Sequence, residues 1–320
     1  MSRPIFLLVD GHALIYRAFY ALPPLTDPQG RVVNAVYGFS RVLLSALDDF
    51  EPEYTAVAFD LPGPTLRHEE FEDYKAHRPE MPDDLKPQIP LVKQVVEALN
   101  IPQFSLEGYE ADDLIGTVSY QLDHCPQELG APEDLLTVIV TGDKDMFQLV
   151  DDNTHVWIPG RGKRGDTEYD YATVQKKMGV RPDQIVDLKA LMGDASDNIP
   201  GIKGIGIKTA VKLLQNFDNL DKLYQSVERV QAGQADAQEK NILKGALLKK
   251  LARGRDKAFL SQKLAQIDQQ VSVEIDLDHC RVDSYDKTKA VELFQALEFR
   301  SLISMLPNDQ FEADVQSALF

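Results

Sequence analysis

The fold is decided by residues 5–11, IFLLVDG, because five consecutive apolar residues followed by Asp-Gly are typical of a buried parallel strand with a polar carboxyl end. The same pattern returns at residues 55–59 and at residues 136–140. Amphipathic helical patterns lie between these strands, at residues 35–47 and 86–99. The sequence therefore predicts an α/β fold in which helices flank a sheet with a parallel centre.

Acidic residues follow each predicted strand, and further acids begin a helix at residues 110–113 (EADD) or lie in a loop at residues 193–198 (GDASDN). In open α/β sheets, ligands bind beyond the carboxyl ends of the strands, so we expect the strand-end acids to converge although they are far apart in sequence. The candidate metal ligands are Asp10, Asp60, Glu110, Asp112, Asp113, Asp143, Asp145, Asp194 and Asp197.

Each acidic motif alone has an ordinary structural explanation as a helix start, a turn or a capped loop. The nine acids together need a further explanation, because bringing so many like charges close together costs several kcal/mol unless cations neutralise them. All-oxygen ligand sets suit Mg²⁺ or Mn²⁺ rather than zinc. Two such ions about 4 Å apart can activate water and stabilise both oxygens of a phosphodiester displacement, so the sequence predicts a hydrolytic site with two or more divalent cations.

Residues 61–90 contain six prolines and mixed charge, which predicts a long functional loop or lid. Its cations Arg67, Lys75 and Arg78 are candidate catalytic residues near the carboxyl edge of the sheet. Lys75 and Arg78 are three residues apart, so we expect them to share a helical face over the metals and to stabilise charge on a scissile phosphate. A solvated charged helix is the alternative explanation.

No strand-helix alternation is evident after about residue 180, where we place a domain change between residues 1–180 and a helical region at 181–305. Helical patterns there cover residues 183–192, 209–217 and 235–253. Residues 306–320 are interpreted as a tail or the start of a linker. Basic clusters at residues 161–164 and 249–257 are interpreted as contacts to a nucleic-acid backbone or as plain surface.

A glycine-rich hairpin at residues 200–210, PGIKGIGIKTA, leads into one of these helices. Its glycines permit a tight turn and a close approach to a polyanion, and the amides at the following helix start can bind phosphate. A phosphate-binding loop of the Walker type does not fit the spacing, and a plain turn between helices remains the alternative. The candidate DNA contacts here are Gly201, Lys203, Gly204, Gly206, Lys208 and Thr209.

The 320 residues carry a net charge of −17, which taken alone argues against a nucleic-acid-binding protein. Two bound Mg²⁺ ions would reduce this charge to −13 and mask the acids nearest the substrate. No apolar run approaches the ~20 residues that span a bilayer, so we expect a cytoplasmic protein without membrane contact. The two cysteines and six histidines are scattered, which gives no support for a disulfide framework or a zinc site.

The motifs taken in order resemble those of the 5′-nuclease domain of bacterial DNA polymerase I. They lie at residues 9–12, 59–60, 71–78, 108–113, 141–145, 193–198 and 200–206, and the resemblance covers about residues 5–305. It implies a PIN-like α/β nuclease with a helical arch at about 61–90. It also implies a helix-three-turn-helix element at about 183–220 that grips duplex DNA with a bound K⁺.

The same resemblance implies that the nine acids bind metal, that Lys75 and Arg78 are basic groups at the base of the arch, and that Tyr74 contacts DNA. The expected activity is that of a structure-specific 5′-3′ exonuclease and flap endonuclease, which removes 5′ flaps and RNA primers. The expected partner is branched DNA, together with a covalently linked polymerase domain if the chain is part of a longer protein. A monomer is the default.

Two other functions remain open. A PIN-type ribonuclease would share the carboxylate-and-metal chemistry, although a hairpin that grips a duplex is superfluous for cutting single-stranded RNA. A binding module that recruits a polymerase to DNA junctions would use the acids only to fix structural cations. Turnover of substrate distinguishes this module from an enzyme. A phosphatase of the haloacid-dehalogenase type is remote, because Asp10 lacks a second Asp two residues later.

Overall fold

The computed structural model describes residues 3–160, 165–282, 285–309 and 312. A six-stranded sheet forms its centre, with the order β3-β2-β1-β4-β5-β6. Strands β1 to β5 are parallel to their neighbours, and β6 is antiparallel to β5. The strands are β1 (Ile5–Asp10), β2 (Tyr54–Ala58), β3 (Gln103–Phe104), β4 (Leu136–Val140), β5 (Thr154–Ile158) and β6 (Thr167–Tyr169). The predicted α/β sheet with a parallel centre is confirmed.

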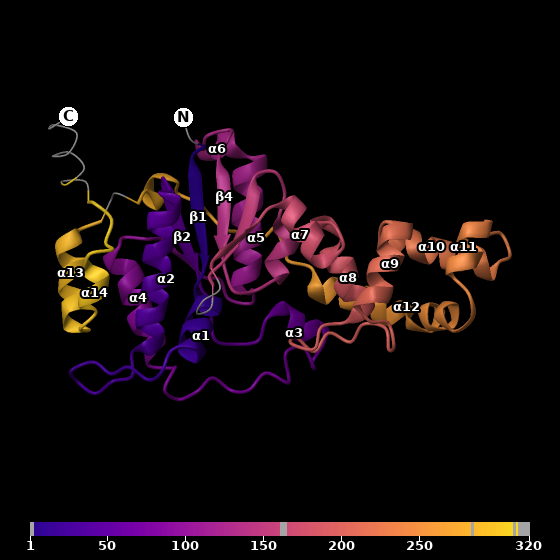
Figure 1. The fold of residues 1–320 in the computed structure, drawn as a ribbon, viewed down its shortest axis with the longest axis horizontal. Helices are drawn as coiled ribbons and strands as arrows, with labels where there is room; N and C mark the ends of the chain where they lie inside the picture. The colour runs from indigo at the N-terminus through magenta and orange to yellow at the C-terminus, as the bar shows by residue number, and fades with distance from the viewer. Residues whose placement is uncertain (1–2, 161–164, 283–284, 310–311, 313–320) are drawn as a thin grey trace.

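Helices cover both faces of this sheet, because successive side chains of a strand point to opposite faces. On β1, Phe6 and Leu8 belong to the core shared with α5 (Ala111–His124). Leu7 and Val9 belong to the second core, shared with α1 (Gly11–Ala21), α2 (Asn34–Phe50) and α4 (Gln88–Ala98). The result is a three-layer α/β/α arrangement, with α2 and α4 on the opposite side of the strands from α5 (Figure 1).

Residues 61–87 form a long connection that contains the short helix α3 (Leu66–Glu70) followed by turns, and the rest of the predicted excursion to residue 90 already belongs to α4. Lys75 has a φ of 56°, in the left-handed region that interrupts any right-handed helix. Lys75 and Arg78 therefore do not share a helical face, and that part of the sequence prediction is wrong.

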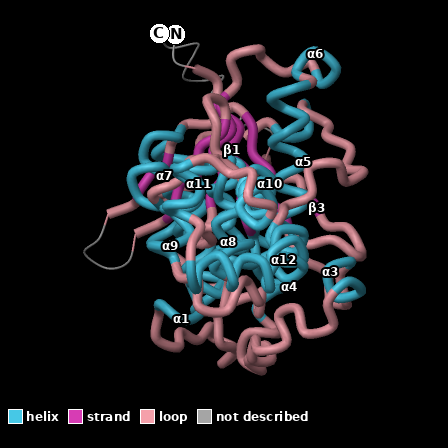
Figure 2. The backbone as a smooth tube through the Cα atoms, turned by 90° about the vertical axis from the view of Figure 1, so that its right-hand side faces the viewer, coloured by secondary structure: helices cyan, strands magenta, loops and turns pink. Residues whose placement is uncertain are grey.

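Among the described residues after residue 180 the regular elements are helices, and α8 to α12 extend to one side of the sheet domain (Figure 1). Seen from that end, α8 to α12 lie in front of the strands (Figure 2). These helices are α8 (Ile185–Met192), α9 (Ile207–Phe217), α10 (Leu220–Gln231), α11 (Ala237–Ile242) and α12 (Gly245–Ala265), after the 3₁₀ turn η2 (Pro182–Gln184). The predicted helical patterns correspond to η2 with α8, to α9, and to α11 with part of α12.

Smaller elements complete the chain, and two of them pack on the far side of the sheet domain. Helices α13 (Lys287–Ala296) and α14 (Arg300–Ile303) pack against α4 and α2, respectively. The others are α6 (Pro126–Leu129), α7 (Tyr171–Met178), η1 (Asp145–Leu149) and η3 (Asp278–Cys280). No helix among the described residues is long and apolar enough to cross a membrane. The predicted basic cluster at 161–164 and residues 310–311 and 313–320 of the predicted tail lie outside the described residues.

Candidate active site

The site begins at the point where the strand order reverses, between β1 and β4. Asp10 ends β1, and its Oδ2 accepts a hydrogen bond of 2.7 Å from the hydroxyl of Thr141, which follows β4. Its Oδ1 accepts from the backbone N–H of Ala13 at 3.0 Å and so caps helix α1. Asp10 is only 3% exposed. Its carboxylate is therefore fixed at the edge of the sheet by two neighbouring elements.

A cavity of about 370 Å³ opens beside Asp10. Acids from four parts of the chain meet there, as the sequence predicted for strand ends and the start of α5. The Oδ1 of Asp60 is held by the backbone N–H of Ala111 at 2.8 Å. The Asp60 amide donates to the His12 ring at 3.0 Å, which makes His12 a hydrogen-bonding residue of the site. The acids that line the cavity are Asp10, Asp60, Glu110, Asp112 and Asp143, and the cations Lys75 and Arg78 join them.

Burial and the neighbouring acids disfavour the charged form of the carboxyl groups in this cavity and so raise their pKa values. Burial raises the pKa of Asp10 to about 7, and the nearby carboxylates of Asp60 and Asp143 add to this effect. Burial also raises the pKa of Asp112 well above its ordinary value, and the charge of Asp10 contributes. A bound cation would relieve both effects.

The oxygen-only donor set fits a hard divalent cation. In the part of the chain that the structure describes, however, no group of three His, Cys, Asp or Glu side chains already stands in a geometry that could hold a metal ion. The donor chemistry for such an ion is present at the cavity, and water molecules commonly complete the shell of Mg²⁺.

Lys75 occupies the cavity from the side of the long connection. Its Nζ lies 2.6 Å from Oε1 of Glu110, and the hydroxyl of Tyr74 donates to Oε2 of the same carboxylate at 3.1 Å. Burial alone would lower the pKa of Lys75, but the carboxylates of Glu110, Asp197 and Asp112 together outweigh it, and the pKa is raised. Lys75 therefore carries a positive charge in the site. Tyr74, a candidate DNA contact, is 3% exposed and packs inside the protein instead.

A second group of acids surrounds Lys189, which lies on α8 and is 8% exposed. Its Nζ lies 2.6 Å from Oδ2 of Asp194 and also forms an ion pair with Asp145. Burial would raise the pKa of the partly exposed Asp194, but the charge of Lys189 and hydrogen bonds from Lys189 and Ser196 lower it to about 2. At Asp145, burial and the charge of Asp143 prevail over Lys189 and raise the pKa to about 7. Sequence reasoning missed Lys189, and its only signal was a single cation in a helix whose other residues, apart from Asp187, are apolar.

Asp197 connects this acidic loop to the long connection. Its carboxylate lies 2.6 Å from Nη2 of Arg78, and its backbone carbonyl accepts from the N–H of Lys75 at 3.0 Å. The side chain of Asn198 donates to the carbonyl of Asp73 at 2.6 Å. The predicted acids Asp145, Asp194 and Asp197 are thus paired with protein cations near the cavity rather than lining it.

Asp113 and Arg67 are brought together with each other, away from the cavity that holds Asp10. Two hydrogen bonds of 2.7 and 2.6 Å join the Arg67 guanidinium to the Asp113 carboxylate. Both residues line a separate cavity of about 620 Å³. The sequence suggested that Asp113 lies with Glu110 and Asp112 as a metal ligand. The structure places its carboxylate against Arg67 instead.

The glycine-rich hairpin stands at the start of α9. Gly201 has a φ of 55°, and a Cβ there would lie 2.2 Å from the backbone nitrogen of Gly193, so only glycine fits. Ile202 and Ile205 are buried. The carbonyl of Gly204 accepts a hydrogen bond from Nζ of Lys250 at 2.9 Å. Lys203, Gly204, Gly206 and Lys208 are exposed and Thr209 is partly exposed.

Comparisons with known proteins agree on one family. Residues 5–179 match the family model described as "5′-3′ exonuclease, N-terminal resolvase-like domain", and residues 180–288 match "5′-3′ exonuclease, C-terminal SAM fold". DNA polymerase I of Chloroflexus aurantiacus is 44% identical over 316 residues, which are 96% of this chain and 31% of that protein. DNA polymerase I of Caldicellulosiruptor bescii is 40% identical over 302 residues, 94% of this chain and 33% of that protein. The chain spans about a third of the length of these relatives.

Solved structures share the fold at lower identity. The T5 5′-exonuclease with bound zinc ions has a TM-score of 0.62 at 20% identity and covers 94% of this chain and 99% of its own. The catalytic core of Rad2 in complex with DNA substrate has a TM-score of 0.60 at 20% identity and covers 95% of this chain and 93% of its own. These similarities establish the architecture, a mainly parallel sheet flanked by helices.

Proposed function

The chain belongs to the 5′-3′ exonuclease family, and we propose that it is a metal-dependent nuclease that hydrolyses phosphodiester bonds at 5′ flaps and RNA primers. The observation that carries this proposal is the cavity in which five carboxylates meet the two cations Lys75 and Arg78. Carboxylates would hold the metal, and cations would bind the phosphate, so both halves of the chemistry lie in one place.

The residues that would hold divalent cations are the cavity acids, with Asp145, Asp194 and Asp197 as the candidates for a further ion. Such ions, Mg²⁺ or Mn²⁺, would activate water for attack and neutralise charge on the phosphate. Asp10 gives the set its fixed point, since Thr141 and Ala13 hold its two oxygens. Asp113 is dropped from this set, because its oxygens face Arg67.

Lys75 and Arg78 would act on the substrate. Both are ion-paired with carboxylates, Lys75 with Glu110 and Arg78 with Asp197. When a cation neutralises these acids, the ammonium and the guanidinium become available to bind the oxygens of the scissile phosphate. The left-handed turn at Lys75 and its bond to the Asp197 carbonyl would keep the ammonium at the cavity.

The hairpin would bind the duplex part of the substrate through its exposed amides and through Lys203 and Lys208, since backbone contacts of this kind carry no sequence information. A K⁺ ion at the hairpin carbonyls would strengthen this grip. We further propose that the protein acts as a monomer in the cytoplasm, and that a linked DNA polymerase domain is its covalent partner. The similarity to longer polymerases supports that partner.

The test compares two substrates, a 5′-end-labelled DNA flap and a single-stranded RNA of equal length, in Mg²⁺ and in Mn²⁺. Cleavage of the flap near its junction, with little cleavage of the RNA, is the expected outcome. Cleavage of the RNA at comparable rates would favour the ribonuclease alternative, and tight flap binding without turnover would favour a binding module.

A further inference from the structure

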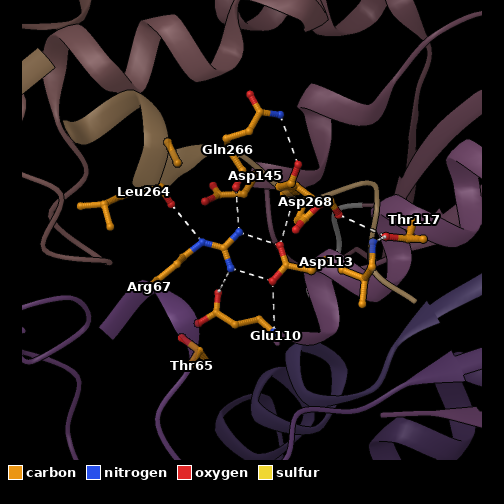
Figure 3. A network of polar contacts seen from close by, with 12 residues as sticks. Thr65, Arg67, Glu110, Asp113, Thr117, Asp145, Leu264, Gln266 and Asp268 are labelled. Carbon is orange, nitrogen blue, oxygen red and sulfur yellow. Dashed lines mark hydrogen bonds and ion pairs between the residues drawn. The ribbon is translucent and has the colours of Figure 1, made fainter. Parts of the chain in front are cut away.

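Arg67 is held at the centre of a polar network that joins two distant parts of the chain (Figure 3). Its Nε donates to the carbonyl of Leu264 at 3.2 Å, and Nη2 donates to the carbonyl of Gln266 at 2.7 Å. The remaining bonds go to Asp113 and, at 3.3 Å, to Oε2 of Glu110. These five bonds match the five N–H groups of a guanidinium. Arg67 therefore has no donor left for a substrate phosphate.

The carboxylate of Asp113 has likewise used all of its hydrogen-bonding sites, and the residue is only 2% exposed to solvent. Its carboxylate accepts two bonds from Arg67, one from the backbone N–H of Glu110 at 3.2 Å and one from the backbone N–H of Asp268 at 2.9 Å. A carboxylate offers about four lone-pair sites. None remains for a metal ion, whereas the adjacent Asp112 lines the cavity with Asp10.

The network reaches the hairpin through helix α12. Gly254 of that helix packs so closely that a Cβ would lie 2.7 Å from the side chain of Ile202. The backbone N–H of Gly201 donates to the Ser261 hydroxyl at 2.9 Å. The hairpin therefore rests on α12, and the last residues of α12 and the turn after it are bonded to Arg67.

We propose that Arg67 and Asp113 are positioning residues that form a clasp, by which helix α12 and its hairpin set the position of Glu110 in the active site. The clasp rests on the proposed nuclease function. Arg67 and Asp113 hold one oxygen and the backbone N–H of Glu110, whose other oxygen faces Lys75 in the cavity. A duplex seated on the hairpin is thus connected to the acid cavity through continuous bonded contacts.

The variants follow from the physics of buried ion pairs. Removing one partner leaves a buried charge unpaired and is strongly destabilising, whereas replacing both by apolar residues of similar volume is often tolerated. We therefore use the double variant Arg67→Met/Asp113→Leu, the single variant Asp113→Asn and the comparison variant Asp112→Asn. Arg41→Met controls for the loss of a cation, because Arg41 is exposed on α2, which covers the opposite face of the sheet.

Binding of Mn²⁺ alone, measured by titration calorimetry, separates a clasp residue from a metal ligand. Asp113→Asn keeps a side-chain oxygen that can accept from Arg67, so Glu110 should stay near its place and the Mn²⁺ affinity should fall clearly less than in Asp112→Asn, which should lose at least about 10-fold. An equal loss in both variants would overturn the assignment of Asp113. This measurement requires no turnover.

Flap cleavage well below the unfolding midpoint supplies the second readout. The double variant should lose about 10- to 100-fold in kcat with KM changed by less than about 3-fold, because a misplaced Glu110 affects the bound complex. A kcat equal to that of the wild type and of Arg41→Met would contradict the clasp.

Amide hydrogen exchange completes the test without substrate or metal. In the double variant, exchange should accelerate about 10-fold at both residues 108–112 and residues 264–268 while α2 stays protected. Acceleration in only one of the two segments would contradict the clasp. If the wild-type protein does not cleave flaps, the proposed nuclease function fails. Amide hydrogen exchange of the double variant still tests the clasp in that case.

Discussion

The hydroxyl of Thr141 donates a hydrogen bond of 2.7 Å to the carboxylate of Asp10, and it thereby joins the ends of the neighbouring strands β1 and β4. This bond opposes the effect of burial, because it lowers the pKa of Asp10. Thr141 is itself fully buried. The bond therefore has a structural and an electrostatic consequence, and both can be measured.

Replacing Thr141 with Val keeps the shape of the side chain and removes this bond, together with the bond of 3.0 Å that the hydroxyl accepts from the backbone N–H of Asp143. We expect the free energy of unfolding to fall by about 1–3 kcal/mol, because a buried carboxylate oxygen loses its partner. The pKa of Asp10 should rise further, so Mn²⁺ should bind more weakly at pH 7 than to the wild type. Thr55→Val is the matched control, since the Thr55 hydroxyl donates to the carbonyl of Leu7 on the same sheet. Equal Mn²⁺ affinities for the two variants would contradict the account.

The pKa of Asp10 predicts a pH dependence of stability in EDTA. The folded-state pKa of about 7 exceeds the ordinary value of 3.8, so the folded protein retains a proton that the unfolded chain has lost between these values. The contribution of Asp10 to stability is fully present below about pH 4 and is lost as the pH rises to about 7. Above that pH the loss is constant, on the order of 2–4 kcal/mol.

Asp10→Asn should remove this dependence. The variant should therefore gain stability relative to the wild type between pH 5 and pH 8 in urea unfolding experiments, whereas the exposed Asp48→Asn should follow the wild type. Stability curves of Asp10→Asn and wild type that stay parallel over this range would contradict the assignment.

Lys189 predicts an effect that depends on metal. In Lys189→Met, Asp145 and Asp194 lose their shared cation, and we expect a destabilisation of about 3–5 kcal/mol in EDTA. If these acids can hold a divalent ion, millimolar Mn²⁺ should restore much of the lost stability. Thermal unfolding with and without Mn²⁺ measures this effect. A variant that is equally unstable in both conditions would remove Asp145 and Asp194 from the candidate ligands.

The hairpin lysines predict a change in the salt dependence of DNA binding. Lys203→Gln/Lys208→Gln should weaken duplex binding in EDTA and reduce the slope of log K against log salt by about 2, because two phosphate contacts are lost. Lys240→Gln on α11 is the control, since Lys240 is also exposed but lies outside the hairpin. If the control and the double variant have the same slope, the hairpin does not bind the DNA backbone.

Three strands were predictable from the sequence because each is a continuous apolar run, as parallel strands buried on both faces require. Strand β3 has only two residues, and β5 and the edge strand β6 carry polar residues such as Thr154 and Glu168, so they lack that signal. Their positions depend on pairing with β2, β4 and β5, respectively, which only the tertiary structure supplies.

The convergence of Asp10, Asp60 and Asp143 was predictable because strand ends of a parallel sheet meet at one edge. The sequence could not predict that Asp112 lines the cavity while Asp113 faces Arg67. Adjacent residues of a helix point about 100° apart, and the sequence does not say which of the two faces the sheet edge. Lys189 was unpredictable for a related reason. Its partner Asp145 reaches it through the packing of α8 against η1, whereas Asp194 lies in the loop that follows α8.

We propose that carboxylates of the Asp10 cavity hold the metal that drives phosphodiester cleavage. The most direct measurement follows release of a 5′-end-labelled DNA flap by the wild type, Asp112→Asn and Asp48→Asn, in Mg²⁺ and in EDTA, with folding of each checked by circular dichroism. We expect cleavage by the wild type and Asp48→Asn only in Mg²⁺, and a loss of at least about 100-fold in Asp112→Asn. Cleavage that persists in EDTA, or a folded Asp112→Asn with wild-type activity, would contradict the claim.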